Sequence, residues 1–287
     1  MPMDLSQIGR EIGPNEIRWT PDACILYALG VGAGTSELAF TTENTEGISQ
    51  RVLPTFVTTV GRGGGAGQVD ALSFGSYGPH QVVHASHKVE LQRALLPEGR
   101  ALATMRVAGI WDKRAGALVE LETTARDAET GEVMFRNIAS LFVLGEGGFG
   151  GPHGPVLGGP RHPAREPDHT VSEVTRPEQA LIYRLSGDHN RIHSDPAVSR
   201  LASFERPILH GLCSFGYAGR ALLNAVCNGD PARFRSMSAR FAKPGFPGDT
   251  LTTRIWVDVE LAQFETRSQR GDALVERGVF TFAKSQG

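Results

Sequence analysis

Apolar and polar positions alternate along two regions of the chain, and each region follows segments with helical spacing. Within residues 81–144, four segments alternate with period two, which is typical of strands with one buried face. Within residues 236–283, three further segments alternate in the same way. The expected strands cover residues 81–91, 101–111, 117–126, 133–144, 236–242, 250–264 and 273–283. The run over 250–264 is long enough to bend.

The helical segments are marked by their ends. In the first half, Thr20 is placed as an N-cap, Pro21 follows in the first turn, and Gly30 ends the helix. In the second half, helices are expected over residues 177–187, over a short stretch after Asp195, and over residues 209–226. Short turns join the strands, and βαβ alternation is missing. The pattern predicts an α+β fold in which a helix lies across a bent antiparallel sheet, twice.

Residues 145–166 break this pattern, because glycine, proline and histidine dominate there. Such a composition does not bury enough apolar surface to form a packed element. We therefore expect domains at 1–146 and 167–287, joined by a linker at 147–166. Two medium cores are expected rather than one large core.

Composition excludes several classes of function. The 29 Lys and Arg residues are balanced by 31 Asp and Glu, and the net charge of −2 gives no general attraction to nucleic acid or to an anionic membrane. The 3 cysteines show no CxxC spacing, so neither zinc nor disulfides are implied. No signal peptide or membrane span is visible. We expect a cytoplasmic protein.

The densest candidate chemistry lies in residues 183–196, where Asp188, Asn190 and His193 follow a glycine turn. Gly211 stands at the head of the longest expected helix, where backbone N–H groups can stabilise an oxyanion. An acid, an imidazole and an oxyanion donor indicate proton-transfer chemistry.

Simpler interpretations exist for the same residues. Asp188 and Asn190 could be turn residues whose side chains bond their own backbone. His189 and His193 could be metal ligands, but a glutamate is not interposed and Gly187 disfavours a helix, so we expect no metal. His210 is interpreted as a helix-start or packing histidine.

The run Tyr183-Arg-Leu-Ser-Gly-Asp-His-Asn-Arg-Ile-His193 resembles the hydratase 2 motif of the MaoC-like family, R-specific enoyl-CoA hydratases with a double hotdog fold. The resemblance covers most of the chain, through Leu26-Tyr-Ala-Leu-Gly-Val-Gly-Ala33, Val52-Leu-Pro-Thr-Phe56, His210-Gly-Leu-Cys213, Arg240-Phe-Ala-Lys-Pro244 and Pro247-Gly-Asp-Thr250. It implies two antiparallel sheets, each wrapped round a helix, side by side in one chain.

The resemblance also implies roles for single residues. Asp188 and His193 become the catalytic pair, Asn190 holds the loop, and the Gly211 N–H stabilises the thioester enolate. The implied substrate and CoA contacts are His84, Ala85, Lys113, His189, Arg191, Ile192, Arg240, Phe241 and Lys243. Without the resemblance, Lys113 is a solvated turn residue, and Arg240 and Lys243 could protect an exposed strand edge.

The chain departs from the family pattern at two places. His84-Ala85-Ser86-His87 stands where many members have His-Gly-Glu-Gln, and on a regular strand one of these histidines could face a cleft and the other solvent. Arg191 replaces the proline that usually follows Asn190, which removes a φ restraint from the loop.

The expected reaction is the reversible hydration of a trans-2-enoyl-CoA to the (3R)-3-hydroxyacyl-CoA. It needs a base for the water, an acid for the α-carbon, and a donor to the enolate oxygen. CoA is part of the substrate, so we expect no separate cofactor, and the partners are the acyl-CoA thioester and a second copy in a homodimer. A hotdog acyl-CoA thioesterase and a non-catalytic acyl-CoA-binding subunit remain as alternatives.

Overall fold

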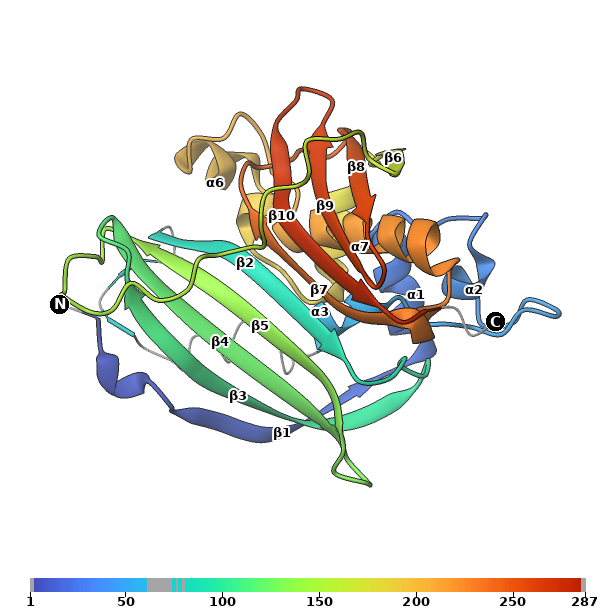
Figure 1. The fold of residues 1–287 in the computed structure, drawn as a ribbon, viewed down its shortest axis with the longest axis horizontal. Coiled ribbons are helices and arrows are strands. Elements are labelled where there is room, and N and C mark those ends of the chain that lie inside the picture. Colours follow the sequence, from blue (N-terminus) through green and yellow to red (C-terminus); the bar gives the residue numbers. More distant parts are fainter. Residues whose placement is uncertain (1–2, 61–73, 76, 79–80, 285–287) are drawn as a thin grey trace.

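The period-two segments form strands of one antiparallel sheet in the computed structural model, which describes residues 3–60, 74–75, 77–78 and 81–284. The described strands are ordered β1-β3-β4-β5-β2-β7-β10-β9-β8-β6. They are β1 (Glu11–Trp19), β2 (Val82–Leu91), β3 (Gly99–Asp112), β4 (Gly116–Asp127), β5 (Val133–Leu144), β6 (His169–Val174), β7 (Phe234–Phe241), β8 (Thr250–Val257), β9 (Leu261–Ser268) and β10 (Ala273–Phe282). The predicted α+β class is confirmed, and its two sheets join edge to edge where β2 pairs with β7 (Figure 1).

Each half of the chain contributes one long helix. In the first half this is α1 (Pro21–Gly30), which is capped by the predicted Thr20, whose Oγ1 accepts from the Ala23 N–H at 3.3 Å. In the second half it is α7 (Gly211–Cys227), which β7 to β10 cover (Figure 1). The shorter helices are α2 (Leu38–Thr41), α3 (Val57–Val60), α5 (Gln179–Tyr183) and α6 (Pro196–Leu201).

Three strand expectations needed correction. The strands β1 and β6 were not predicted, and both lie at edges of the described sheet. Pro14 interrupts the pairing of β1 with a register shift, and the side chains of β6 are exposed or half-buried, so neither shows clean alternation. The run over 250–264 is two strands, because a tight turn at 258–260 separates β8 from β9.

The buried apolar side chains form one main cluster that draws on both halves, together with a smaller cluster in the first half. The expectation of two separate cores is therefore wrong for the described residues. The pairing of β2 with β7 makes the sheet continuous, so the residues beneath it pack across the boundary between the halves.

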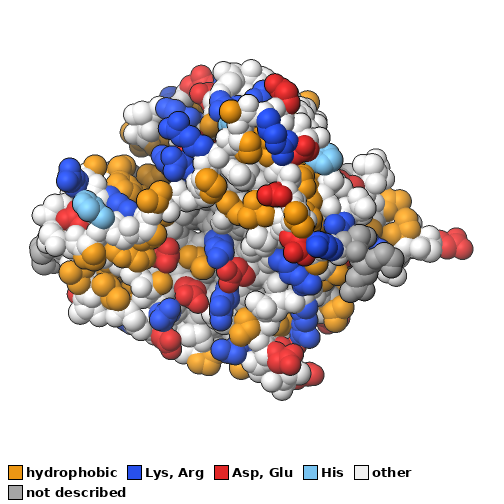
Figure 2. Space-filling view, viewed as in Figure 1, with side chains coloured by type: hydrophobic (Ala, Val, Ile, Leu, Met, Phe, Trp, Pro, Cys, Tyr) orange, Lys and Arg blue, Asp and Glu red, His pale blue; other side chains and the backbone are white. Residues whose placement is uncertain are grey.

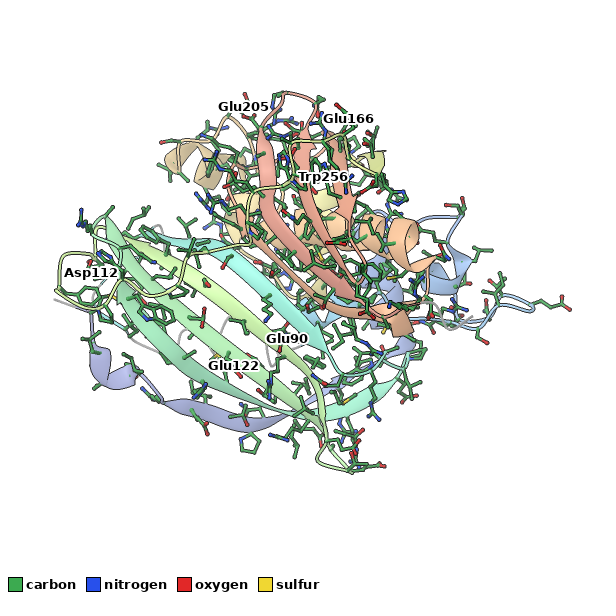
Figure 3. All side chains as sticks on the ribbon, in the orientation of Figure 1. Glu90, Asp112, Glu122, Glu166, Glu205 and Trp256 are labelled. Carbon is green, nitrogen blue, oxygen red and sulfur yellow. The ribbon has the colours of Figure 1, made fainter. Side chains whose placement is uncertain are left out.

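The linker lacks helices and strands between Leu144 and His169, yet its first part is anchored at the β3–β4 turn. The carboxylate of Asp112, whose side chain lies at the tip of this turn (Figure 3), accepts from the backbone N–H groups of Gly148 at 2.9 Å and Gly150 at 2.8 Å. It also accepts from the Arg114 N–H at 2.8 Å. Asp112 is only 5% exposed, so it is a buried anchor for the linker.

The second part of the linker crosses the outer face of β10, β9 and β8 (Figure 1). The Gly159 N–H donates to the Arg277 carbonyl at 2.8 Å. The His162 ring stacks on Trp256 with a centroid separation of 4.2 Å, and the Trp256 Nε1 donates to the Arg165 carbonyl at 2.8 Å. Figure 3 labels Trp256 among the second-half strands. Backbone and side-chain bonds therefore replace regular secondary structure in holding this segment.

Basic and acidic side chains are interspersed on the face shown in Figure 2, in keeping with the small net charge. Across the described parts of the chain, helices of the length and apolarity that a bilayer crossing requires are not found.

Candidate active site

The loop that carries the proposed acid begins at a glycine. Gly187 has a φ of +112°, a left-handed conformation that disfavours a Cβ, and it ends the 3₁₀ turn Arg184–Ser186. The next residue is Asp188, whose Oδ1 accepts from the Asn190 backbone N–H at 3.3 Å. The glycine therefore reverses the chain, and the carboxylate lies half-buried directly after the reversal.

Asn190 caps the turn that ends at His193. Its Oδ1 accepts from the Ile192 N–H at 3.1 Å. The Ile192 carbonyl then accepts from the Ser199 hydroxyl at 2.8 Å, and the His193 Nδ1 donates to the Ile208 carbonyl at 2.9 Å. Because a carbonyl only accepts, this bond places the proton of neutral His193 on Nδ1 and leaves Nε2 with its lone pair.

Arg191, the residue that replaces the family's proline, restrains the loop by another route. Its guanidinium pairs with the Asp195 carboxylate at 2.5 Å. Asp195 is the N-cap of α6, and its Oδ1 accepts from the Ala197 N–H at 2.8 Å. The hydrogen bond from Arg191, together with these backbone bonds, lowers the pKa of Asp195. An ion pair to a helix cap thus takes over part of the restraint that a proline ring would give.

Three side chains meet beside this loop: Asp188, His193 and His210. Their candidate ligand atoms all lie within 4.8 Å of one another, and His210 is only 1% exposed. The His193 and His210 rings are stacked, with centroids 3.6 Å apart and planes at 25°. The His210 Nε2 donates to the Asp188 backbone carbonyl at 3.2 Å.

This group has the donor types of a metal site, but its geometry suits one poorly. Zinc binds imidazole nitrogen at about 2.0–2.1 Å along the in-plane lone pair. The stacked rings of His193 and His210 are inclined by only 25°, so their in-plane lone pairs lie in two nearly parallel planes, which one ion cannot share well. The geometry favours proton handling by Asp188 and His193 over shared coordination.

Gly211 is the first residue of α7, so its backbone N–H lies at the positive end of a 17-residue helix. The residue is exposed, and a Cβ built on it would lie 3.3 Å from the Cδ1 of Phe241. The glycine therefore leaves open the space beside its N–H that a thioester oxygen needs. Phe241, at the end of β7, forms one wall of that space.

His84 and His87 lie on the same side of β2, which corrects the expectation that one of them could face solvent. A register shift between His84 and Ser86 interrupts the alternation at Ala85. The His87 Nδ1 and His84 Nε2 are 3.3 Å apart, and His87 is 4% exposed. The His84 ring meets Phe241 edge to face at 4.9 Å, so this histidine from the first half lies beside a wall of the Gly211 space.

The remaining predicted contacts lie at the surface. Lys113 donates from Nζ to the Pro155 carbonyl at 2.7 Å, and Arg240 pairs with Glu276 at 3.4 Å. Lys243 is exposed, two residues after Phe241. The other predicted residues are exposed His189 and half-buried Ile192 and Ala85. The structure thus brings His84 and Phe241 together beside Gly211, and places the cations at more exposed positions.

Cys213 lies two residues after Gly211 but is not an available nucleophile. Its thiol donates to the Gly30 carbonyl at 3.3 Å, and burial raises its pKa well above the ordinary thiol value. Since the thiolate is the reactive form, this cysteine is a packing residue at neutral pH.

From sequence alone, His210 is interpreted as a helix-start or packing histidine and is not placed in the site. Its place directly before Gly211 was a signal that it lies near the oxyanion site. Its stacking on His193 and its bond to Asp188 depend on tertiary packing, so no sequence pattern revealed them.

Comparisons with known proteins match the two halves separately. The MFE-2 hydratase 2 N-terminal domain model matches residues 18–145, and the MaoC like domain model matches residues 160–277.

Whole-chain comparisons agree with these matches. The 3-hydroxyacyl-thioester dehydratase Y of Mycobacterium tuberculosis is 44% identical, over 89% of this chain and 88% of that protein. The peroxisomal enoyl-CoA hydratase 2 of Arabidopsis thaliana is 35% identical, over 88% of this chain and 86% of that protein. The crystal structure of a MaoC-like dehydratase from Phytophthora capsici has a TM-score of 0.90 at 30% identity and covers 98% of both chains.

Proposed function

This chain belongs to the family of MaoC-like proteins with a hydratase 2 N-terminal domain, and we propose that it is a hydro-lyase that reversibly hydrates trans-2-enoyl-CoA to (3R)-3-hydroxyacyl-CoA. Its fold is the double hotdog of that family. The observation that carries the proposal is the meeting of Asp188 and His193 beside the N-terminus of α7.

The spacing of Asp188 and His193 allows them to hold one water molecule. A hydrogen bond to a water oxygen is about 2.8 Å long, so two groups up to about 5.6 Å apart can share that water. The ligand atoms of this pair lie within 4.8 Å. One group removes a proton from the water as its oxygen bonds to C3 of the enoyl thioester, and the other supplies the proton that bonds to C2. Two groups that share one water would act from one side of the substrate, so addition would be to a single face.

The Gly211 N–H stabilises the charge that develops between these steps. As the water oxygen bonds to C3, the electron pair of the double bond moves toward the thioester oxygen, which becomes enolate-like. A donor at the N-terminus of α7 has both its own hydrogen bond and the helix dipole to offer. The missing Cβ of Gly211 lets the oxygen approach beside Phe241.

The CoA part of the substrate is proposed to leave this space between the two halves. His84 and Phe241 would contact the thioester side, and the exposed cations Arg240 and Lys243 would meet the phosphates. A cytoplasmic location and a homodimer remain predictions.

One experiment tests the function. The protein is incubated with crotonyl-CoA and with a longer 2-enoyl-CoA, while the conjugated-alkene absorbance and free thiol are followed separately. We expect the absorbance to fall without thiol release, and a dehydrogenase specific for (3R)-3-hydroxyacyl-CoA to oxidise the product. Asp188→Asn and His193→Gln should each lower kcat by about 10²–10⁴-fold, the usual contribution of a general acid or base.

The asparagine at position 188 keeps an oxygen for the Asn190 N–H, so the loop should persist. His169→Gln, a change at an exposed histidine on β6, is the matched control and should leave kcat unchanged. Thiol release would indicate a thioesterase. A constant absorbance without thiol release would indicate a binding subunit. Near-wild-type turnover by folded Asp188→Asn or His193→Gln would refute the assigned roles.

A further inference from the structure

His210 contacts three parts of the proposed site at once. Its ring stacks on His193 at 3.6 Å, its Nε2 donates to the Asp188 backbone carbonyl at 3.2 Å, and its own backbone continues into Gly211. The ring is buried, and its side chain does not cap α7, although the residue stands at the N-cap position. The side chain therefore serves the catalytic loop instead of the helix end.

The ring of His210 contacts a second aromatic ring. Tyr183, which is also buried, packs against it with a centroid separation of 4.9 Å and an interplanar angle of 50°. Tyr183 ends α5, directly before the turn that leads to Asp188. Movement of the His210 ring would therefore disturb the start of the catalytic loop as well as the position of His193.

We propose that His210 is a positioning residue, which fixes the ring plane of His193 and the backbone of Asp188 relative to the Gly211 N–H. This inference rests on the proposed hydratase function. Asp188 lies between the glycine turn and the turn that Asn190 caps. The bond from His210 supplies a restraint at the carbonyl of the catalytic residue itself. The stack supplies a second restraint, on the face of the His193 ring.

The two restraints can be removed separately. His210→Phe keeps an aromatic ring to stack on His193 but loses the donor to the Asp188 carbonyl. His210→Gln keeps an N–H donor at about the reach of the imidazole Nε2 but loses the stack. His210→Ala loses both. If positioning is its role, kcat should fall in each variant and fall furthest in His210→Ala, while KM changes little because the proposed CoA contacts lie elsewhere.

The expected fall in kcat is about tenfold for His210→Phe and about a hundredfold for His210→Ala, since misplacement of a reacting group by about 1 Å can cost that much. Phe280→Leu is the control for a purely structural effect, because Phe280 is buried among Phe234 and Phe282 in the second half. It should lower the melting temperature while its folded fraction keeps the wild-type kcat.

A second measurement does not depend on turnover. The ¹⁵N shifts of the His193 imidazole report its tautomer, and we expect the Nδ1–H form to be fixed in the wild type and averaged in His210→Ala. If the wild type hydrates enoyl-CoA but the three His210 variants keep at least half of its kcat and a fixed tautomer, the positioning role is refuted and the hydratase function stands. If the wild type hydrates nothing, the proposed function fails, and the tautomer of His193 still decides the positioning role. If His210→Ala does not fold, His210→Gln and His210→Phe carry the same comparison.

Discussion

Gly211→Ala should separate catalysis from stability. The new Cβ would lie 3.3 Å from Phe241 Cδ1 and 3.5 Å from Cε1, close enough that the ring must give by a few tenths of an ångström. Phe241 is half-buried, so it has room to move. Alanine is favoured over glycine in a helix by about 1 kcal/mol, and this gain offsets the free-energy cost of moving the ring. We therefore expect a melting temperature equal to that of the wild type, or higher by up to about 2–4 °C.

The same methyl group should damage the proposed oxyanion site. It stands beside Phe241, in the space where the thioester oxygen must approach the N–H to about 2.9 Å. Loss of one oxyanion donor typically costs about 10²–10³-fold in rate, or about 2.7–4 kcal/mol, and we expect kcat/KM for crotonyl-CoA to fall by that amount. The reaction is followed by loss of the alkene absorbance, and stability by thermal unfolding.

Two variants sharpen this comparison. Gly34→Ala, where a Cβ meets nothing within 4 Å, is the matched control and should change neither quantity. Phe241→Leu in the Gly211→Ala background should not restore activity if the methyl itself blocks the oxygen. Wild-type kcat/KM in folded Gly211→Ala would refute the assignment of this N–H.

Two further predictions concern stability. Arg220→Met should lower the free energy of unfolding by about 3–5 kcal/mol, because the Arg220 side chain is 6% exposed and its removal takes away the ion-pair partner of both Glu37 and Glu173. Urea unfolding measures this loss, and a value below about 1 kcal/mol would contradict the prediction. Asp112→Asn should loosen the linker. Bonds from the N–H groups of Gly148, Arg114 and Gly150 hold the pKa of Asp112 below its ordinary value. The ionised carboxylate therefore contributes fully to the free energy of unfolding at pH values above the ordinary carboxyl pKa, and this contribution is lost as the pH falls through the lower pKa of the folded state. Thermal unfolding measured across pH should show that the melting temperatures of the wild type and Asp112→Asn become more similar in acid. A difference that stays constant with pH would contradict the role of the charge.

Local chemistry explains which elements were predictable from sequence. Thr20 and Pro21 carry helix-start information in their own side chains, and the structure begins α1 there. Gly187 likewise marked a reversal that needs a left-handed residue. The spacing of Asp188 and His193 predicted a shared loop, and the loop places the two groups within 4.8 Å.

The features that sequence did not reveal depend on partners far away along the chain. His84 and His87 share a side only because β2 pairs with both β5 and β7, with a register shift at Ala85. The strands β1 and β6 have one paired edge, so polar side chains and Pro14 are tolerated there and conceal the alternation. His210 looked like a packing residue because its two functional contacts come from other elements.

The first half has no catalytic motif, yet it positions the helix that presents the oxyanion donor. The last carbonyls of a helix lack partners within it, and those at the end of α1 are met by side chains from the second half. The bonds are Gln179 Nε2 to Leu29 and Gly30 at 3.0 and 2.7 Å, Cys213 Sγ to Gly30 at 3.3 Å, and Arg220 Nε to Val31 at 3.2 Å. Cys213 and Arg220 lie on α7, so the helix that begins at Gly211 is registered against the end of α1. The geometry of the Gly211 N–H is therefore a property of both halves together, although every residue proposed to move a proton comes from the second.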